Sequence, residues 1–310
     1  YGKFSRGNVD ALDRMTHASR SSRVKIRIGI SGWTYKPWRG AFYPEDLPQR
    51  EELEFAARQF RSIEINGTHY GLQTPKSFQS WRERTPDDFV FSVKGGRYIT
   101  HLRRLREIRK PLANFFASGV LALEEKLGPF LWQFPPTFQF DAGRFENFLQ
   151  LLPADTEAAV KLGREHDDHL KDRAWLRPKV QQKLRHAVEI RHKSFLVPQF
   201  VELLRKFGIA FVLADTAGKW PYVEELTGDF LYARLHGDKE LYASGYSEEA
   251  LQDWAGRIRG FQAGKLRTEA PRVTNLKPRK PREAFIYFDN DVKVKAPRDA
   301  KRLAEILHAT

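Results

Sequence analysis

The sequence contains no cysteine, a single methionine and no long uninterrupted hydrophobic run. Without cysteine, disulfide bonds, thiolate zinc sites and a cysteine nucleophile are excluded. No window approaches the roughly 18 consecutive apolar residues of a membrane span, and residues 1–24 lack the apolar core of a secretory signal. These absences fit a reducing compartment, so we expect a cytoplasmic protein that does not contact a membrane.

Acidic residues are scarcer than basic ones: the sequence has 39 Asp and Glu and 53 Lys and Arg, which gives a formal net charge of +14. Most of this excess lies in two segments, residues 1–27 and 264–283, each with seven basic and two acidic residues. Basic charge concentrated in a terminal segment and a loop predicts weak, non-specific and salt-dependent nucleic-acid binding through phosphates.

The chain has 310 residues, of which 41% are apolar and 13% aromatic, enough to bury one large core. From residue 25 on, short apolar or alternating runs are followed by segments with helical spacing, which is typical of βαβ units and a parallel sheet. Helical spacing is clearest at residues 51–60, 145–152, 198–207, 248–261 and 299–307. Eight strands are predicted, at residues 26–31, 62–66, 89–94, 130–134, 187–191, 210–215, 230–236 and 284–289.

Eight parallel strands close a barrel, so the predicted fold is a single (β/α)₈ barrel of the TIM type spanning residues 25–310. Residues 1–24 are predicted to form a flexible basic leader. The basic, proline-rich run 264–283 is predicted to be an insert before the eighth strand, at the N-terminal end of the barrel.

Alternation of side chains along each strand predicts which residues point into the barrel. Ile63 and Ile65 face the helices, which turns Glu64 and Asn66 inward. The same argument turns Lys94, Glu189, Arg191, Tyr232, Arg234 and His236 inward, while Gln133, Asp215 and Asp289 end three further strands. Polar residues at the C-terminal ends of barrel strands predict an active or binding site. The alternative is an ion-pair lattice that only fills the top of the barrel.

We expect the catalytic acid–base groups to be Glu64, Glu189 and His236. Basic and polar residues around them match phosphate or carboxylate ligands. Aromatic residues in the loops after strands one, two and seven would rim the same cavity: Trp33, Tyr35, Trp38, Tyr70, Tyr242 and Tyr246. The predicted substrate-binding residues are Asn66, Tyr70, Lys94, His101, Gln133, Arg191, His192, Arg234, Tyr242, Tyr246 and Asn290.

A basic run at residues 101–110, which has helical character, is the best nucleic-acid patch near this face; the alternative is an ordinary solvated helix face. A divalent metal could draw on Glu64, Glu189, Asp215 and His236, with His192 or Asp289. Lys94, Arg191 and Arg234 point into the same cavity and compete for the carboxylates, so we expect no tightly held metal and no other cofactor.

Seven strings along the chain form a recognisable series. They are GISGWTYKPWRGAFYP (29–44), SIEINGTHYGLQTPKSFQSWRERTPDDFVFSVK (62–94), ITHLRRL (99–105), LGPFLWQFPPTF (127–138), AVEIRHKSF (187–195), LYARLHGDKELYASGYS (231–247) and YFDND (287–291). These strings resemble those of the YecE-like family, catalogued as domain of unknown function 72. The resemblance covers roughly residues 25–308 and implies a (β/α)₈ barrel without an established activity. Gly67, His69 and Phe195 stand where the family pattern leads us to expect Ser, Phe and Trp.

The sequence thus predicts an enzyme that acts on an anionic substrate, phosphorylated or nucleic acid, at the C-terminal face of the barrel. Two alternatives stay open. The first is a nucleic-acid-binding protein without catalysis. The second is a metal-dependent phosphoesterase resembling endonuclease IV, which rests on similarity of barrel architecture alone. The sequence favours no oligomeric state.

Overall fold

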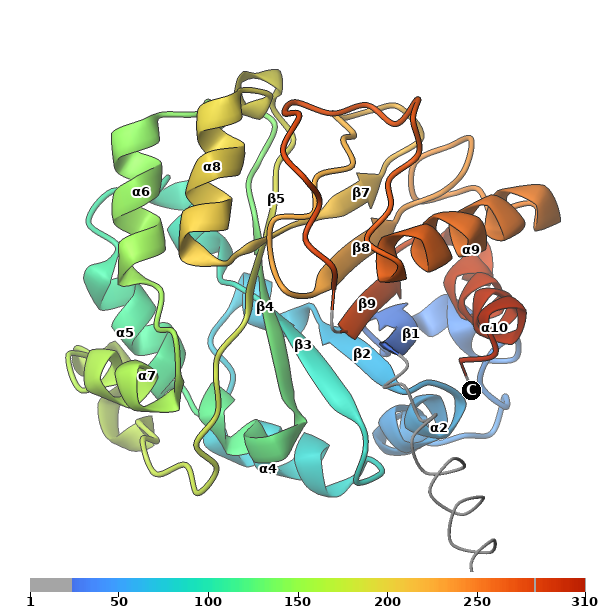
Figure 1. The fold of residues 1–310 in the computed structure, drawn as a ribbon. Coiled ribbons are helices and arrows are strands. Elements are labelled where there is room, and N and C mark those ends of the chain that lie inside the picture. The colour runs from blue at the N-terminus through green and yellow to red at the C-terminus, as the bar shows by residue number, and fades with distance from the viewer. Residues whose placement is uncertain (1–23, 282, 310) are drawn as a thin grey trace, which may run out of the picture.

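The computed structural model describes residues 24–281 and 283–309. Nearly all of the predicted leader therefore lies outside the described residues. Parallel strands form a barrel surrounded by helices (Figure 1), as the TIM-type prediction requires. The strands are β1 (Lys25–Ser31), β2 (Ser62–Ile65), β3 (Val90–Lys94), β4 (Leu127–Gln133), β5 (His186–Glu189), β6 (Ala210–Phe211), β7 (Leu213–Asp215), β8 (Leu231–Leu235) and β9 (Glu283–Phe288).

The strand order is β6-β5-β4-β3-β2-β1-β9-β8-β7, with nine strands in place of the predicted eight. The difference arises at Val212, which divides the predicted sixth strand in two. Phe211 on one side pairs with Val188 of β5, and Leu213 on the other pairs with Ala233 of β8. Because β6 and β7 are consecutive pieces of one strand, this change of partner closes the barrel.

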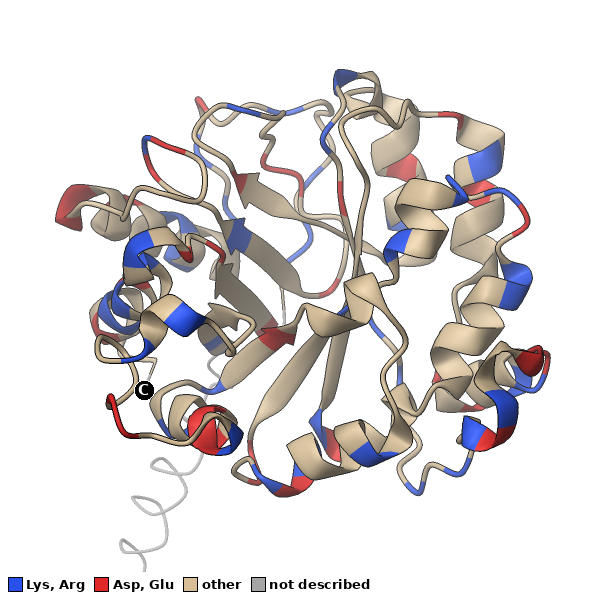
Figure 2. Cartoon of the chain, turned by 180° about the vertical axis from the view of Figure 1, so that it is seen from behind, with Lys and Arg blue, Asp and Glu red and all other residues tan. Residues whose placement is uncertain are grey.

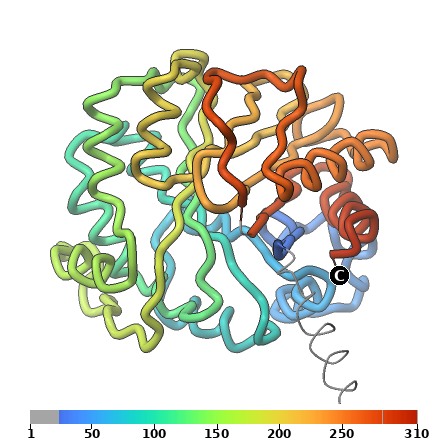
Figure 3. The backbone as a smooth tube through the Cα atoms, viewed as in Figure 1, coloured from blue at the N-terminus to red at the C-terminus, as the bar shows by residue number. Residues whose placement is uncertain are grey.

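All five predicted helices are present. The helices are α2 (Glu52–Gln59), α3 (Gly67–Tyr70), α4 (Pro75–Glu83), α5 (Arg109–Ala117), α6 (Ala142–Leu151), α7 (Thr156–Gly163), α8 (Pro198–Phe207), α9 (Glu248–Gln262) and α10 (Lys295–Leu307). Local sequence explains their ends: Asp141, Asp155 and Ser247 cap the first turns of α6, α7 and α9 through their side chains. Figure 3 follows the chain once around the barrel, from β1 to α10, which packs beside β1.

The basic run at residues 101–110 is not a continuous helix, so that prediction is wrong. A π-helical turn, Tyr98–Leu102, is followed by irregular backbone in which Arg104, Leu105 and Glu107 have positive φ. Helix α5 begins only at Arg109. The side chains of Leu105 and Ile108 are both buried. Their burial holds this segment against the barrel as an irregular loop, whereas a solvated helix would leave one face exposed to water. The basic side chains in this run therefore do not line up on one helical face.

The segment between β7 and β8 has no helix among its described residues, and the basic insert packs against it. The buried carboxylate of Glu225 accepts hydrogen bonds from the backbone amides of Val273 (2.9 Å) and Thr274 (2.7 Å). Further along, the guanidinium of Arg205 at the end of α8 donates to the carbonyl oxygen of Lys277 (2.9 Å). The insert is thus fastened to the outer wall of the barrel by specific contacts.

The inside of the barrel is apolar at the middle and charged at the C-terminal end. Its middle contains a separate buried cluster that includes Leu131, Val212, Tyr232 and Tyr287. The hydroxyl groups of Ser62 and Tyr287 lie 2.7 Å apart and bond to each other. On the outside, charged residues of both signs are spread over the helices and loops (Figure 2). Within residues 24–281 and 283–309, no helix has the length and apolar character needed to cross a membrane.

Candidate functional site

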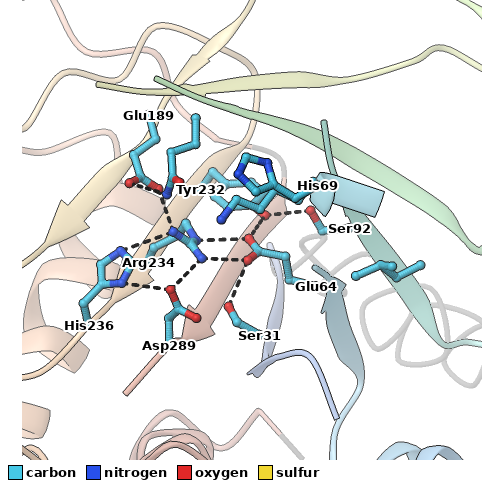
Figure 4. A network of polar contacts seen from close by, with 12 residues as sticks. Ser31, Glu64, His69, Ser92, Glu189, Tyr232, Arg234, His236 and Asp289 are labelled. Atoms are coloured by element: carbon cyan, nitrogen blue, oxygen red, sulfur yellow. Dashed lines mark hydrogen bonds and ion pairs between the residues drawn. The ribbon is translucent and has the colours of Figure 1, made fainter. Parts of the chain in front are cut away.

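A single arginine organises the C-terminal mouth of the barrel. Arg234 of β8 is fully buried and bonds to three carboxylates from three other strands or strand ends (Figure 4). Its Nη2 donates to Glu64 Oε1 (2.9 Å) and Asp289 Oδ2 (2.8 Å), and its Nη1 donates to Glu189 Oε2 (2.8 Å). Burial opposes the charge, yet the three carboxylates raise the pKa of Arg234 well above its usual value. The arginine is therefore a permanent cation.

The two buried glutamates have every carboxylate oxygen occupied. Glu64 also accepts from the hydroxyl groups of Ser31 (2.9 Å) and Tyr232 (2.5 Å). Glu189 also accepts from Gln133 Nε2 (2.8 Å) and from the guanidinium of Arg191 (3.0 Å). Burial by itself would raise the pKa of Glu189, but Arg234 and Arg191 outweigh burial and hold this pKa well below its usual range. These contacts form a closed ion-pair network.

His236 belongs to the same network. Its Nδ1 lies 3.0 Å from Asp289 Oδ2, and its Nε2 lies 3.3 Å from Arg234 Nη1. Burial and the neighbouring Arg234 lower the pKa of His236, so the ring is neutral near pH 7. The side chain has no exposed surface. The histidine is therefore packed between Asp289 and Arg234 and does not face the opening.

Lys94, at the end of β3, differs from the other charged residues of the mouth. Only 8% of its surface is exposed, and the carboxylates around it are bonded to Arg234. In the described part of the chain, its ammonium group has no hydrogen-bond or ion-pair partner. Burial, followed by repulsion from Arg234, lowers the pKa of Lys94 to about 8. Among the described residues, this amine is the one strand-end cation of the mouth without a partner in the network.

Two histidines lie beside Lys94. The rings of His69 and His101 meet edge to face, with centroids 5.0 Å apart. Nδ1 of His69 is 2.9 Å from the carbonyl oxygen of Gly95, so this nitrogen carries the proton and Nε2 is an acceptor. Burial and then Lys94 lower the pKa of His69 to about 3 and that of His101 to about 4. Both rings are therefore neutral near pH 7.

Arg191, which follows β5, also contributes to the mouth. Besides its bond to Glu189, its guanidinium donates to the hydroxyl group of Tyr242 (3.1 Å) and lies over the ring of Trp220, 3.7 Å from the centroid. His192 bonds within its own turn and not to this cluster: its Nδ1 accepts from the backbone amide of Ser194 (3.1 Å). Arg191 and Tyr242 thus lie at the mouth, while His192 caps a short turn.

Two predicted binding residues hold loops together. Tyr246 is buried and donates to Asp215 Oδ2 (3.0 Å), which also accepts from Trp254 Nε1 (3.2 Å). Asn290 is buried and donates to Asp299 Oδ2 (2.9 Å). The sequence places both residues at the C-terminal end of the barrel but does not show that the hydroxyl group of Tyr246 bonds to Asp215 of β7 and the amide of Asn290 to Asp299 of α10.

The remaining predicted residues are divided between rim and core. Tyr70 is 73% exposed and follows Asn66, whose buried Oδ1 has no partner among the described residues. Trp38 is fully buried, and the hydroxyl group of Tyr35 donates to the carbonyl oxygen of Ser31 (2.5 Å). Of the predicted binding residues, the structure brings together at the mouth Lys94, His101, Gln133, Arg191, Arg234 and Tyr242.

Sequence reasoning missed two groups. His69 lies in α3, directly after β2, and Asp291 lies two residues after the strand-end Asp289. Burial, followed by the charge of Asp289, raises the pKa of Asp291 to about 8, so this carboxyl group is largely protonated near pH 7. Both follow barrel strands at the C-terminal end, and searching the loops as well as the strands would have found them.

A cavity adjoins the mouth on the side of β2 and β3. Its volume is about 610 Å³, the size of a small-molecule pocket. His69 contributes to its wall, which connects the cavity to the histidine pair. Aromatic and apolar residues form much of the lining, among them Tyr70, Leu72, Ile99 and Phe115, with Gly96 two residues after Lys94.

The carboxylates of the mouth do not fit a divalent metal. Glu64, Glu189 and Asp289 surround Arg234, whose guanidinium occupies the central position that a cation would need. Asp215 is bonded to Tyr246 and Trp254 instead. Among the described residues, no group of three or more His, Cys, Asp or Glu side chains could hold a metal ion.

The fold and the charged mouth define an α/β barrel of the TIM type. A family model described as protein of unknown function DUF72 matches residues 27–310. The chain belongs to the DUF72 family, which confirms the resemblance seen in the sequence.

Named relatives and solved structures agree. The chain is 30% identical over 138 residues to the UPF0759 protein YecE of Escherichia coli (strain K12), a match covering 44% of this chain and 48% of YecE. This match thus spans about half the length of that relative. The UPF0759 protein YunF of Bacillus subtilis (strain 168) is 21% identical over 311 residues, covering 91% of this chain and 94% of YunF.

A DUF72 family protein from Thermotoga maritima superimposes with a TM-score of 0.70 at 26% sequence identity, covering 92% of this chain and 99% of that one. A DUF72 family protein from Enterococcus faecalis, at 16% identity, has a TM-score of 0.67 and covers 92% and 96% of the two chains. The barrel is therefore common to the family.

Proposed function

We propose that this chain is an enzyme whose active site is the barrel mouth and whose substrate carries a phosphate or a similar anionic group. The observation that supports this most is the positive potential at His101. The charges that lower the pKa of this ring, after burial, are those of Lys94, Arg191 and Arg97. An anion at that position would be attracted by the same three cations.

The mouth also contains groups suited to proton transfer. The carboxyl group of Asp291, with its pKa raised to about 8, can donate a proton near pH 7. His69 and His101 are neutral near pH 7, and with pKa values of about 3 and 4 they are weak bases suited to hydrogen-bonding a substrate. In this proposal Glu64, Glu189 and His236 act indirectly, because they fix Arg234 and so shape the potential at the opening.

The proposal is tested by calorimetric titration with pyrophosphate as the probe. Arg97 is exposed and contributes only charge, so Arg97→Gln should weaken binding several-fold and reduce its dependence on salt. Lys206→Gln is the matched control, because Lys206 pairs with Glu146 on the outer surface. Absence of pyrophosphate binding, or equal affinities of wild type and Arg97→Gln, would contradict an anion site at the mouth.

A second candidate, nucleic-acid binding without catalysis, is favoured by a different surface. A hollow of about 1420 Å³ lies at the N-terminal end of the barrel, opposite the mouth. Its basic lining residues outnumber the acidic ones, Asp88, Asp229 and Glu283. The basic residues are Lys25, Arg27, Arg61, Arg185, Arg259 and Lys280.

This candidate predicts a salt-dependent affinity for DNA of any sequence. Each lost phosphate contact should reduce the slope of log affinity against log salt by about 0.9. A Lys25→Gln, Lys280→Gln double variant should therefore lose affinity for labelled duplex DNA, whereas Arg97→Gln should not. If only Arg97→Gln weakens DNA binding, the nucleic-acid surface is the mouth and the second candidate is eliminated.

A further inference from the structure

We propose that Lys94 is a nucleophilic lysine that forms an imine with its substrate, and that this substrate is an aldehyde or ketone carrying an anionic group. The inference rests on the proposed function, because the carbonyl compound must enter the same mouth. It adds a reaction class and names the atom, Lys94 Nζ, that makes the bond.

The surroundings of Lys94 supply what an amine nucleophile requires. A lysine reacts only when unprotonated, and a desolvated site beside another cation favours that form. Arg234 is that cation: it is fully buried and held by three carboxylates, so it cannot move away. The carboxylates that would otherwise pair with Lys94 are occupied by the same arginine. The network therefore has a chemical consequence beyond filling the barrel.

Groups from several elements act on the charge of this amine. After burial, repulsion by Arg234 lowers the pKa of Lys94, and the attraction of the carboxylates only partly compensates. Those carboxylates come from β2, β5 and the end of β9. The groups that face the amine are Arg234, Asp289, Glu64, Glu189, His69 and His101.

The step balances without an oxidant or reductant. The Nζ lone pair attacks the carbonyl carbon, an N–C bond forms, and the C=O π electrons move to oxygen. A proton passes from nitrogen to that oxygen, giving a carbinolamine. Protonation of the hydroxyl group from solvent lets the C–O bond break, so water leaves and the nitrogen lone pair forms the C=N bond of a protonated imine.

The geometry also indicates the shape of the substrate. The anionic group would lie toward Arg97 and Arg191, the cations that act on His101 with Lys94. An apolar remainder would fit the 610 Å³ cavity, whose wall includes Gly96, two residues after Lys94, and His69, whose pKa responds to the charge of Lys94. Small anionic aldehydes are therefore suitable probes.

The test is reductive trapping of the full chain with glyoxylate and sodium cyanoborohydride at pH 7, with labelled residues quantified by proteolysis and mass spectrometry. The hydride of the reagent reduces the imine to a stable amine. At pH 7, an amine with a pKa of about 8 is unprotonated roughly 300-fold more often than one at 10.5. Allowing for restricted access, Lys94 should be labelled at least about ten-fold faster than exposed Lys183 and Lys206.

Acetaldehyde provides a neutral comparison, and it should label Lys94 more slowly than glyoxylate does. Lys94→Arg keeps the charge but cannot form an imine, so it should bind pyrophosphate and lose the label at this position. Labelling of Lys94 no faster than of Lys206 would overturn the inference. If pyrophosphate binds but Lys94 is not trapped, the imine proposal is contradicted while the anion site stands. If Lys94 is trapped equally well by glyoxylate and acetaldehyde, the proposal that the substrate is anionic is contradicted.

Discussion

Two kinds of buried charge share the mouth of this barrel. Around Arg234, each guanidinium nitrogen has a carboxylate or imidazole partner, and each oxygen of Glu64 and Glu189 has a donor. Beside it, Lys94 is almost as deeply buried and has no such partner among the described residues. The comparison teaches that convergence of charged residues does not define a reactive site: a saturated network is structural, and a group left unsatisfied beside it is available for chemistry.

The largest expected effect comes from breaking the saturated network. Arg234→Met leaves three carboxylates buried without their cation, which should lower the free energy of unfolding by about 3–5 kcal/mol. Urea denaturation followed by circular dichroism measures this change. Arg82→Met is the matched control, because its pair with Glu125 is exposed and should contribute about 0–1 kcal/mol. Similar losses of stability in the two variants would show that the buried network stabilises the fold no more than an exposed ion pair does.

A smaller effect of opposite sign is expected for Lys94→Met. The folded state binds this proton only up to pH about 8, whereas the unfolded chain binds it up to about 10.5. The lysine therefore destabilises the folded state fully below pH 8, and the penalty disappears as pH rises from 8 to 10.5. Replacing it should stabilise the protein by about 3 kcal/mol at pH 7 and by less at pH 10.

Denaturation of wild type and Lys94→Met at both values of pH checks this prediction. Lys206→Met serves as the control for loss of a lysine on the outer surface. A destabilised Lys94→Met protein would show that the ammonium group makes favourable contacts, which would place Lys94 in the structural class.

The smallest effect extends the comparison to the outer wall. Glu225 is buried and its carboxylate is satisfied by backbone and hydroxyl donors of Val273 and Thr274, so it should be structural. Glu225→Ala should cost about 1–3 kcal/mol and speed proteolytic cleavage within residues 264–281. Glu269→Ala, a change at an exposed residue of the same segment, should do neither. Equal cleavage of both variants would mean that Glu225 does not fasten the insert.

The alternation of strand and helix patterns predicted the fold, and strand parity predicted the inward residues, because both depend only on local sequence. The outward pair Ile63 and Ile65 was enough to turn Glu64 inward, and the structure buries its carboxylate against Arg234. The same local argument could not find the break at Val212. That break depends on which neighbouring strand each half of the segment pairs with, a property of the closed barrel.

The sequence could not predict which residues of the site bond to one another. Tyr246 and Asn290 lie near the mouth, but no local pattern identifies their partners: Asp215 lies 31 residues from Tyr246, and Asp299 lies nine residues from Asn290. Likewise, nothing local distinguishes Arg234 from Lys94, because both are inward cations near strand ends. Only the placement of three carboxylates around one of them separates a structural residue from a reactive one.

The pKa of Lys94 tests this distinction most directly. Reductive ¹³C-methylation of the full chain, with the resonance of Lys94 assigned through Lys94→Arg, allows its titration by NMR between pH 6 and pH 11. Burial and the neighbouring Arg234 predict a midpoint of about 8 for Lys94, well below the model lysine value of 10.5. A Lys94 midpoint at the ordinary lysine value would contradict the assignment of Lys94 as the reactive amine.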